Sequence, residues 1–268
     1  MHPELFSIGP ISIKTYGFCM ALGFFAAWQV LGWLCKKSGR SSEAFSNLVV
    51  YLLIGGVLGS RTAYVIEHWS AEFAANPVDV VKVWQGGLMF YGGLLLDILI
   101  FLAWCIARRE KMLEVADLLT AVIPLGHAFG RIGCFFYGCC YGKTSNAAWA
   151  VAFPRGSPAW HEQAQAGLIP WSATESLPVL PTQFVEAAAL LVLFAAVLLA
   201  YRRFHASKPG FTTGCYLAGY AVVRFALEYM RGDPRAAFCE MSIGQIISLL
   251  IFSCGLSFIS VAFFRKKA

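Results

Sequence analysis

The sequence predicts an all-α polytopic membrane protein with seven transmembrane helices, an N-terminus outside the membrane and a cytoplasmic C-terminus. The first observation behind this prediction is the composition: 58% of the 268 residues are hydrophobic, only 13% are charged, and the mean hydropathy is +0.64. A soluble domain usually carries about 25% charged residues. The composition therefore excludes a disordered chain, a nucleic-acid-binding arm and an ordinary soluble enzyme. We expect residues 1–268 to form a single integral-membrane domain.

The second observation is a set of apolar stretches long enough to cross a bilayer, which takes about 20 residues per helix. Runs of this length indicate helices, because helices satisfy their own backbone hydrogen bonds in lipid. The N-terminal residues that precede them lack the basic region and cleavage site of a signal peptide. The seven stretches are residues 16–35, 45–69, 86–107, 115–136, 182–201, 211–230 and 241–264.

The third observation is that basic residues follow every second stretch. Three Lys or Arg residues come after each of the first, third, fifth and seventh stretches, which accounts for 12 of the 21 in the chain. By the positive-inside rule these clusters are cytoplasmic. The clusters are Lys36, Lys37 and Arg40; Arg108, Arg109 and Lys111; Arg202, Arg203 and Lys208; and Arg265, Lys266 and Lys267.

Two longer segments fall on the outer side in this topology, residues 70–85 and 138–180. The second is polar and rich in proline, and it contains Trp149, Trp160 and Trp171. Tryptophan favours the headgroup level of a membrane. We expect residues 138–180 to form a small outer head or loop segment.

Three arginines, Arg61, Arg131 and Arg224, lie in the outer halves of predicted spans. An arginine at the middle of a span costs about 2.5–3.5 kcal/mol and indicates a functional site. Guanidinium groups around one outer cavity would bind a lipid phosphate bidentately. The alternative is that each arginine pairs with a carboxylate, Glu67 for Arg61 and Glu228 for Arg224.

Residues 125–143 contain the densest group of candidate functional residues. His127 lies four residues before Arg131, so the two share a helix face. The neighbouring cation favours a neutral imidazole, which suits a general base; the alternative is a buried histidine bonded to a carbonyl. Tyr16 and Tyr91 lie at outer ends of spans and would complete the cavity rim, or else belong to an interfacial aromatic belt.

Residues 219–235 form the second dense segment. Arg224, Glu228 and Arg231 follow at positions i, i+4 and i+7 and make one polar stripe on a helix. Such a stripe faces protein or a cavity and not lipid. We expect Arg231 to contribute to substrate binding beside Arg224.

The nine cysteines show no spacing typical of zinc ligands, so we expect no metal and no cofactor. Cys134, Cys139 and Cys140 invite a metal or redox interpretation, but adjacent cysteines are poor chelating partners. Packing as small apolar residues is favoured. The alternative is a disulfide, with Cys239 as one candidate partner.

Seven motifs occur in order along nearly the whole chain: YGFCMALGF, GGVLGSRTAYV, GGLMFYGG, GRIGCFFYG, PTQFVE, RFALEYMR and MSIGQ. Together they resemble the bacterial prolipoprotein diacylglyceryl transferase family. The resemblance implies transfer of a diacylglyceryl group from phosphatidylglycerol to the lipobox cysteine of a preprolipoprotein signal peptide, the first step of lipoprotein maturation. It also implies a multi-pass protein of the bacterial inner membrane, with membrane lipids but no nucleic acid as partners.

The resemblance also assigns residues. It implies that Arg131 binds the phospholipid, that Arg224 and Glu228 are essential, and that three further residues contribute to the substrate site. Those three are Tyr16, Gln183 and Glu186. The chain departs from the family at Cys134, where the family usually has asparagine, and at Tyr91, where the family has a histidine often proposed as catalytic.

A mechanism follows from these residue types. A thiol with a pKa of about 8.5 must lose its proton before it attacks the glycerol carbon. Arg131 and Arg224 are the candidates to stabilise the leaving phosphate, and Arg61 would join them at the lipid. His127 is the candidate base, whereas Tyr91 would serve only if an arginine lowered its pKa.

Three other classes of function remain open. A paralogue would transfer a lipid group to another acceptor, and a lipid or anion transporter would also line a cavity with arginine, usually with an internal repeat. A non-catalytic lipid-binding scaffold would tolerate lysine in place of Arg131. An intramembrane protease is disfavoured, because no Ser/His, Asp/Asp or HExxH arrangement is evident.

Overall fold

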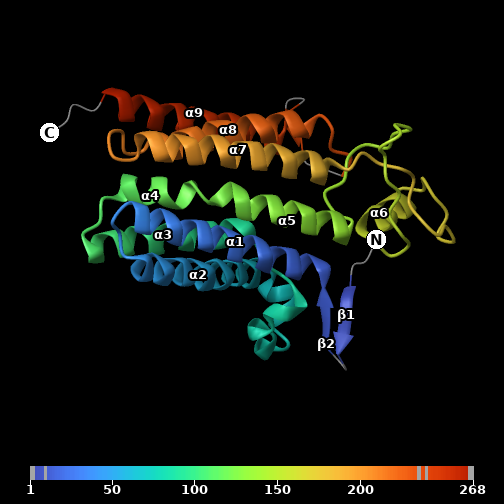
Figure 1. Cartoon of the computed structure of the whole chain (residues 1–268). Helices are drawn as coiled ribbons and strands as arrows, with labels where there is room; N and C mark the ends of the chain where they lie inside the picture. The colour runs from blue at the N-terminus through green and yellow to red at the C-terminus, as the bar shows by residue number, and fades with distance from the viewer. Residues whose placement is uncertain (1–3, 9–10, 234–236, 239–240, 265–268) are drawn as a thin grey trace. The chain divides into compact units, whose positions relative to one another are not determined.

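The computed structural model describes residues 4–8, 11–233, 237–238 and 241–264, and most of these residues are helical (Figure 1). Two short antiparallel hairpins, which the sequence does not predict, accompany the helices. One pairs β1 (Glu4–Ile8) with β2 (Ile11–Lys14), and the other pairs β3 (Ala237–Phe238) with β4 (Met241–Ser242).

The long helices coincide with the predicted apolar stretches. The fourth stretch is divided into two helices, with Pro124 in the first turn of the second. Proline has no backbone N–H and is tolerated at a helix start. The bounds are α1 (Thr15–Lys37), α2 (Ser42–His68), α3 (Phe90–Arg108), α4 (Met112–Thr120), α5 (Ile123–Tyr137), α7 (Thr182–Phe204), α8 (Phe211–Glu228) and α9 (Ile243–Phe264).

Six helical segments of the described chain are long and apolar enough to cross a membrane. They are α1, α2 with the π-helical turn that follows it, α3, α4 with α5, α7 and α9. The all-α, multi-pass prediction is therefore confirmed in its coarse form. The remaining predicted span, residues 211–230, is the helix α8, which is not among the six and carries the charged pair Arg224 and Glu228.

The chain forms two compact units, Met1–Val30 with Ala116–Ala268, and Leu31–Val115. In the first unit α8 packs against both α7 and α9, and α5 packs against α7. Figure 1 shows α7, α8 and α9 running side by side. Since α8 has a packed neighbour on two sides, its polar stripe is largely covered by protein.

The start of α8 is fixed by Asp117 of α4, whose side chain is fully buried. Its carboxylate accepts hydrogen bonds from the backbone N–H of Gly210 at 2.7 Å and from the N–H and hydroxyl of Thr213 at 2.8 and 2.7 Å. A carboxylate at a helix N-terminus satisfies free N–H groups and opposes the positive end of the helix dipole. This contact positions α8 along its own axis.

The first half of α1 lies close against α5 in the same unit. A methyl group added to Gly133 would lie only 3.1 Å from the Tyr16 ring and 3.2 Å from Cβ of Cys19. Small residues allow such close approach of membrane helices. Gly133 of α5 therefore serves the packing of α1.

The predicted outer head, residues 138–180, begins where Gly138 ends α5 in a left-handed conformation (φ 84°). It contains α6 (Pro158–Gln165), with Ser157 as its N-cap, and a small buried cluster of Tyr141, Phe153, Ala159 and Val179. The hydroxyl of Tyr141 donates to Glu162 of α6 at 2.5 Å. The head is thus a folded element in the first unit.

The second unit is built on α2 and α3. They approach so closely that a methyl group on Gly59 would lie 2.5 Å from the carbonyl oxygen of Gly92. The other predicted outer segment forms short turns, η1 (Trp69–Phe73), η2 (Pro77–Val81) and η3 (Val83–Gln85).

Candidate active site

Arg131 of α5 lies between two predicted site residues. Its Nε is 3.0 Å from Oε1 of Glu186 on α7, and the same Nε donates to Nε2 of His127 at 3.2 Å. Glu186 is only 1% exposed, so its carboxylate is paired inside the protein. Because Nε2 of His127 accepts this bond, that nitrogen carries no proton, which agrees with the neutral imidazole expected from the sequence.

Gln183 lies at the start of α7, one turn before Glu186, and is completely buried. Its Nε2 donates to the carbonyl oxygen of Cys139 at 2.8 Å, and the neighbouring Thr182 hydroxyl donates to the carbonyl of Cys140 at 2.8 Å. The first turn of α7 therefore holds the chain that leaves α5. Oε1 of Gln183 has no hydrogen-bond partner among the described residues.

Arg224 and Glu228 pair along α8. Nη2 of Arg224 is 2.8 Å from Oε2 of Glu228, and both side chains are mostly buried. A methyl group on Gly244, at the start of α9, would lie 3.2 Å from Glu228 and 3.3 Å from Arg224, so α9 covers the pair. Nη1 of Arg224 is buried and makes no hydrogen bond to any described residue.

The two groups of charges belong to one electrostatic cluster. Glu186 interacts with Arg131, Arg224 and Arg231, and His127 interacts with Arg131 and Arg224. Three helices of the first unit, α5, α7 and α8, therefore bring together most of the residues that the sequence singles out. These residues are His127, Arg131, Gln183, Glu186, Arg224 and Glu228.

Sequence reasoning missed Tyr220 of α8. Its ring centroid lies 5.5 Å from that of His127, and its side chain interacts with Arg131 and Arg224. Tyr216 stacks on it one turn earlier, with centroids 6.0 Å apart. The sequence pattern that could have revealed Tyr220 is a repeat of four residues. Positions 216, 220, 224 and 228 follow this repeat and therefore lie on one helix face.

Arg231, predicted to contact the substrate, is paired with Asp233 in the structure. Its Nε and Nη2 donate to Oδ1 and Oδ2 of Asp233 at 2.8 and 2.7 Å, and the side chain is 3% exposed. A bidentate pair of this kind occupies the planar fork of the guanidinium. The arrangement favours a structural role at the end of α8 over the predicted contact with substrate.

Arg61 lies in the second unit, where its surroundings also favour a structural role. It donates to the backbone carbonyls of Val80 and Asp79 at 2.8 and 2.6 Å and to those of Gly86 and Gly87 at 2.8 and 3.2 Å. These bonds tie α2 to the outer turns that follow it. The pair with Glu67 that the sequence offered is not among these contacts, and lipid binding by Arg61 stays a prediction.

The two candidate rim tyrosines are both partly exposed. Tyr16 lies in the first turn of α1 beside Gly133 of α5, and its ring centroid is 6.4 Å from that of Tyr137. Tyr91 lies in the second unit at the start of α3, is 57% exposed and meets Phe90 edge-on. The structure thus brings Tyr16 to α5, whereas a role for Tyr91 beside the arginines stays a prediction.

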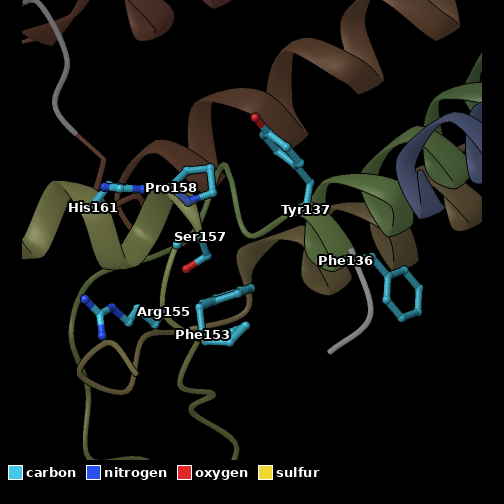
Figure 2. A pocket seen from close by; sticks show the side chains of 9 residues that line it. Phe136, Tyr137, Phe153, Arg155, Ser157, Pro158 and His161 are labelled. Carbon is cyan, nitrogen blue, oxygen red and sulfur yellow. The ribbon is translucent and has the colours of Figure 1, made fainter. Parts of the chain in front are cut away.

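A pocket of about 350 Å³ lies between the end of α5 and the head (Figure 2). Figure 2 shows Phe136 and Tyr137 from α5, with Arg155, Ser157 and His161 from the head, among its lining residues. Its lining combines apolar side chains with the guanidinium of Arg155 and the imidazole of His161. None of the site residues predicted from the sequence lines it.

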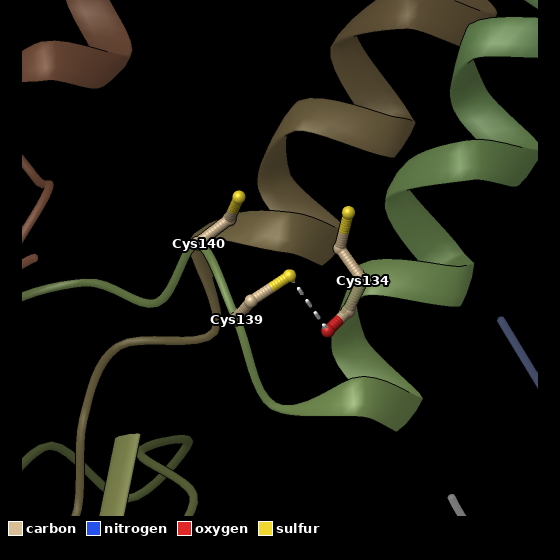
Figure 3. Close-up of side chains that lie close together, drawn as sticks. All are labelled: Cys134, Cys139 and Cys140. Carbon is tan, nitrogen blue, oxygen red and sulfur yellow. Dashed lines mark hydrogen bonds between the residues drawn. The ribbon is translucent and has the colours of Figure 1, made fainter. Parts of the chain in front are cut away.

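The three cysteines at the end of α5, for which the sequence favours packing as small apolar residues, gather closely. The sulfur atoms of Cys134, Cys139 and Cys140 all lie within 4.8 Å of one another (Figure 3). All three are free thiols of intermediate burial. Cys239, the disulfide partner considered from the sequence, lies outside the described residues.

Comparisons with known proteins show the family of the chain. The family model described as "Prolipoprotein diacylglyceryl transferase" matches residues 3–261. Relatives named phosphatidylglycerol–prolipoprotein diacylglyceryl transferase are 33% identical in three bacteria. In Xanthomonas oryzae the match covers 98% of this chain and 91% of the relative, in Rhodospirillum rubrum 98% and 92%, and in Nitratidesulfovibrio vulgaris 96% and 92%. The chain therefore belongs to the prolipoprotein diacylglyceryl transferase family.

Proposed function

We propose that this protein transfers the diacylglyceryl group of phosphatidylglycerol to the thiol of a lipobox cysteine in a preprolipoprotein. The names of its relatives support the donor and the class of acceptor. The lipobox cysteine as the attacking group is our extension of those names, based on the resemblance in the motifs. No observation favours a transporter or a different acceptor.

The observation that carries the proposal is an unsatisfied hydrogen-bond donor on Arg224. Its Nη1 is buried without a hydrogen-bond partner among the described residues, although its Nη2 is paired. A buried donor left without a partner costs about 1–3 kcal/mol, and more when it is charged. An anionic phosphate oxygen offsets this cost, and a phospholipid is the anion that a membrane supplies in abundance.

Arg131 is the second cation of the proposed site. It belongs to the same electrostatic cluster as Arg224 around Glu186. Glu186 and His127 both engage its Nε, and Tyr220 also hydrogen-bonds to this side chain, so a phosphate would share the guanidinium with these protein partners. Two guanidinium groups placed at a phosphodiester stabilise the charge that develops on the leaving oxygen.

In the proposed reaction the cysteine sulfur attacks the glycerol carbon that bears the phosphate ester. A carbon–sulfur bond forms, the carbon–oxygen bond to phosphate breaks, and glycerol phosphate leaves with that electron pair. The thiol proton goes to Nε2 of His127. In the present arrangement Nε2 accepts from Arg131, so the arginine must turn from His127 toward the phosphate before the base is available.

The proposal includes a location. We place the protein in the bacterial inner membrane with seven spans, α8 being the sixth along the chain, the N-terminus outside and the C-terminus in the cytoplasm. The alternating basic clusters support this orientation. The packing of α8 between α7 and α9 accounts for a spanning helix that carries a charged pair.

Complementation tests the proposal. A bacterium depleted of its own transferase should grow when it expresses this chain, and a reporter lipoprotein should gain the mass of one diacylglyceryl group at the lipobox cysteine. The matched control is a reporter with serine in place of that cysteine, which should gain no mass. Growth without any lipid on the reporter cysteine would point to another acceptor and contradict the proposal.

A further inference from the structure

We propose that Cys134, Cys139 and Cys140 form a three-thiolate site for one thiophilic metal ion, with Cu(I) as the best-matched ion. This site is separate in chemistry from the transfer reaction and does not rest on it. Two ligands come from consecutive residues of the loop after α5, and the third comes from the last turn of α5.

The distances between the sulfur atoms fit an ion at their centre. A metal–sulfur bond of about 2.3 Å in a trigonal arrangement separates the sulfurs by about 4.0 Å. In this structure all three sulfurs lie within 4.8 Å of one another, so small side-chain rotations close the site. Figure 3 shows Cys134 and Cys140 directed the same way, with the sulfur of Cys139 between them.

The backbone holds these side chains in place before any ion binds. Cys140 has a left-handed conformation (φ 63°), which is uncommon for a residue with a side chain. The carbonyls of Cys139 and Cys140 accept hydrogen bonds from Gln183 and Thr182, and the Cys139 thiol points back to the carbonyl of Cys134 at 3.9 Å. The local backbone turn therefore overcomes the tendency of adjacent side chains to diverge.

The surrounding charges suit thiolates. Arg131 interacts with Cys134 and Cys140, and Arg231 interacts with Cys140. Three thiolates around a monovalent ion leave a net charge of −2, beside two guanidinium groups that are also paired with Glu186 and Asp233.

The number and type of ligands select the ion. Soft thiolates favour Cu(I) and Zn²⁺, and zinc sites are usually tetrahedral with four protein ligands. The described residues supply three such ligands at this place and no fourth. Cu(I) accepts three sulfurs, and its binding releases the three thiol protons to solvent without any change of oxidation state.

The test is a titration of the full-length protein, purified in detergent under anaerobic, reducing conditions. Cu(I) is added in competition with a coloured Cu(I) chelator, and copper X-ray absorption counts the sulfur ligands. We expect one ion per chain with three sulfurs at about 2.3 Å. Cys134→Ser, Cys139→Ser and Cys140→Ser should each lower the affinity at least tenfold, whereas the control Cys254→Ser, an exposed cysteine outside the cluster, should not.

Each variant is compared with the wild type in helix content and elution volume, and Cys140→Ala provides a second change at the one left-handed position. Less than one ion per chain, an affinity unchanged by all three cluster substitutions, or an equal loss in Cys254→Ser would each overturn the proposal. So would a disulfide within the cluster of the freshly isolated protein, detected after alkylation as two missing alkyl groups on the cluster cysteines. The readouts do not involve lipid transfer, so failure here leaves the proposed function intact.

Discussion

Nε of Arg131 lies 3.0 Å from Oε1 of Glu186, and the same nitrogen donates to His127. Glu186 therefore holds the arginine on the α7 side while His127 occupies the same donor on α5. This relationship makes the orientation of Arg131 depend on a carboxylate that has no access to solvent. It also couples the cation proposed for phosphate binding to the proposed base.

The first prediction concerns that pair. Glu186→Gln should lower both lipid transfer and thermal stability, because removing one partner of a buried ion pair costs about 3–5 kcal/mol. Transfer in vesicles and the unfolding temperature in detergent measure the two effects. Glu175→Gln, an exposed carboxylate of the head, is the control and should change neither. Wild-type values of both quantities in Glu186→Gln would show that the pair is dispensable.

The second prediction concerns the base. His127→Gln should lose most of the transfer rate, since general base catalysis contributes about 10²–10⁴-fold. Tyr91→Phe should lose less, and Tyr91→His should be tolerated because histidine is the commoner family residue there. Initial rates between about pH 6 and 9, where imidazole and thiol titrate, provide the measurement. An active His127→Gln beside an inactive Tyr91→Phe would reverse the two roles.

The third prediction is that Arg61 stabilises the fold and does not bind the lipid. Arg61→Gln should lower the unfolding temperature, since hydrogen bonds of a charged group contribute about 1.5–3 kcal/mol each and four such bonds hold the outer turns. Transfer per folded molecule should stay near the wild-type value. A large loss of rate with an unchanged unfolding temperature would return Arg61 to the substrate site.

The fourth prediction concerns topology. Single cysteines introduced near Asn76, Ser157 and Asp233 into a background without reactive thiols should react with a membrane-impermeant maleimide from outside. Cysteines near Lys37, Glu110 and His205 should react only after the membrane is opened. The alternation of basic clusters is the physical reason. Outside labelling near Glu110 would contradict the seven-span orientation.

The helices were predictable because hydrophobic length is a local property of the sequence. Six of the seven predicted stretches each coincide largely with one helix, the fourth covers two, and basic residues lie at the ends of α1 and α3. Two features were not predictable. The division between α4 and α5 depends on how Pro124 is used, and the hairpins depend on pairing between short segments of weak periodicity.

The site was predictable in part for a related reason. A charge inside an apolar helix is conspicuous, so Arg131, Arg224 and Glu228 could be singled out, and helix spacing placed His127 beside Arg131. The contacts that these side chains make with residues distant in the sequence could not be predicted in this way. The backbone carbonyls around Arg61 and the pair of Arg231 with Asp233 follow from loop conformation, and the gathering of three cysteines follows from one left-handed residue.

The central claim is that Arg131 and Arg224 bind the lipid phosphate and stabilise its departure. Arg131→Ala and Arg224→Ala should each lower transfer by about 10²–10³-fold, the usual loss when one donor to a developing oxyanion is removed. Arg131→Lys should also fail, because a point charge does not replace the planar fork. Arg203→Ala, an exposed basic residue at the end of α7, is the control.

The most direct measurement uses these purified proteins in phosphatidylglycerol vesicles with a lipobox peptide, following the peptide mass and the released glycerol phosphate together. For the wild type and Arg203→Ala we expect one diacylglyceryl group per peptide and one glycerol phosphate for each. For the Arg131 and Arg224 variants, inserted and folded to the same extent, we expect neither product above background. Equal yields of both products from Arg131→Ala and Arg224→Ala would contradict the central claim.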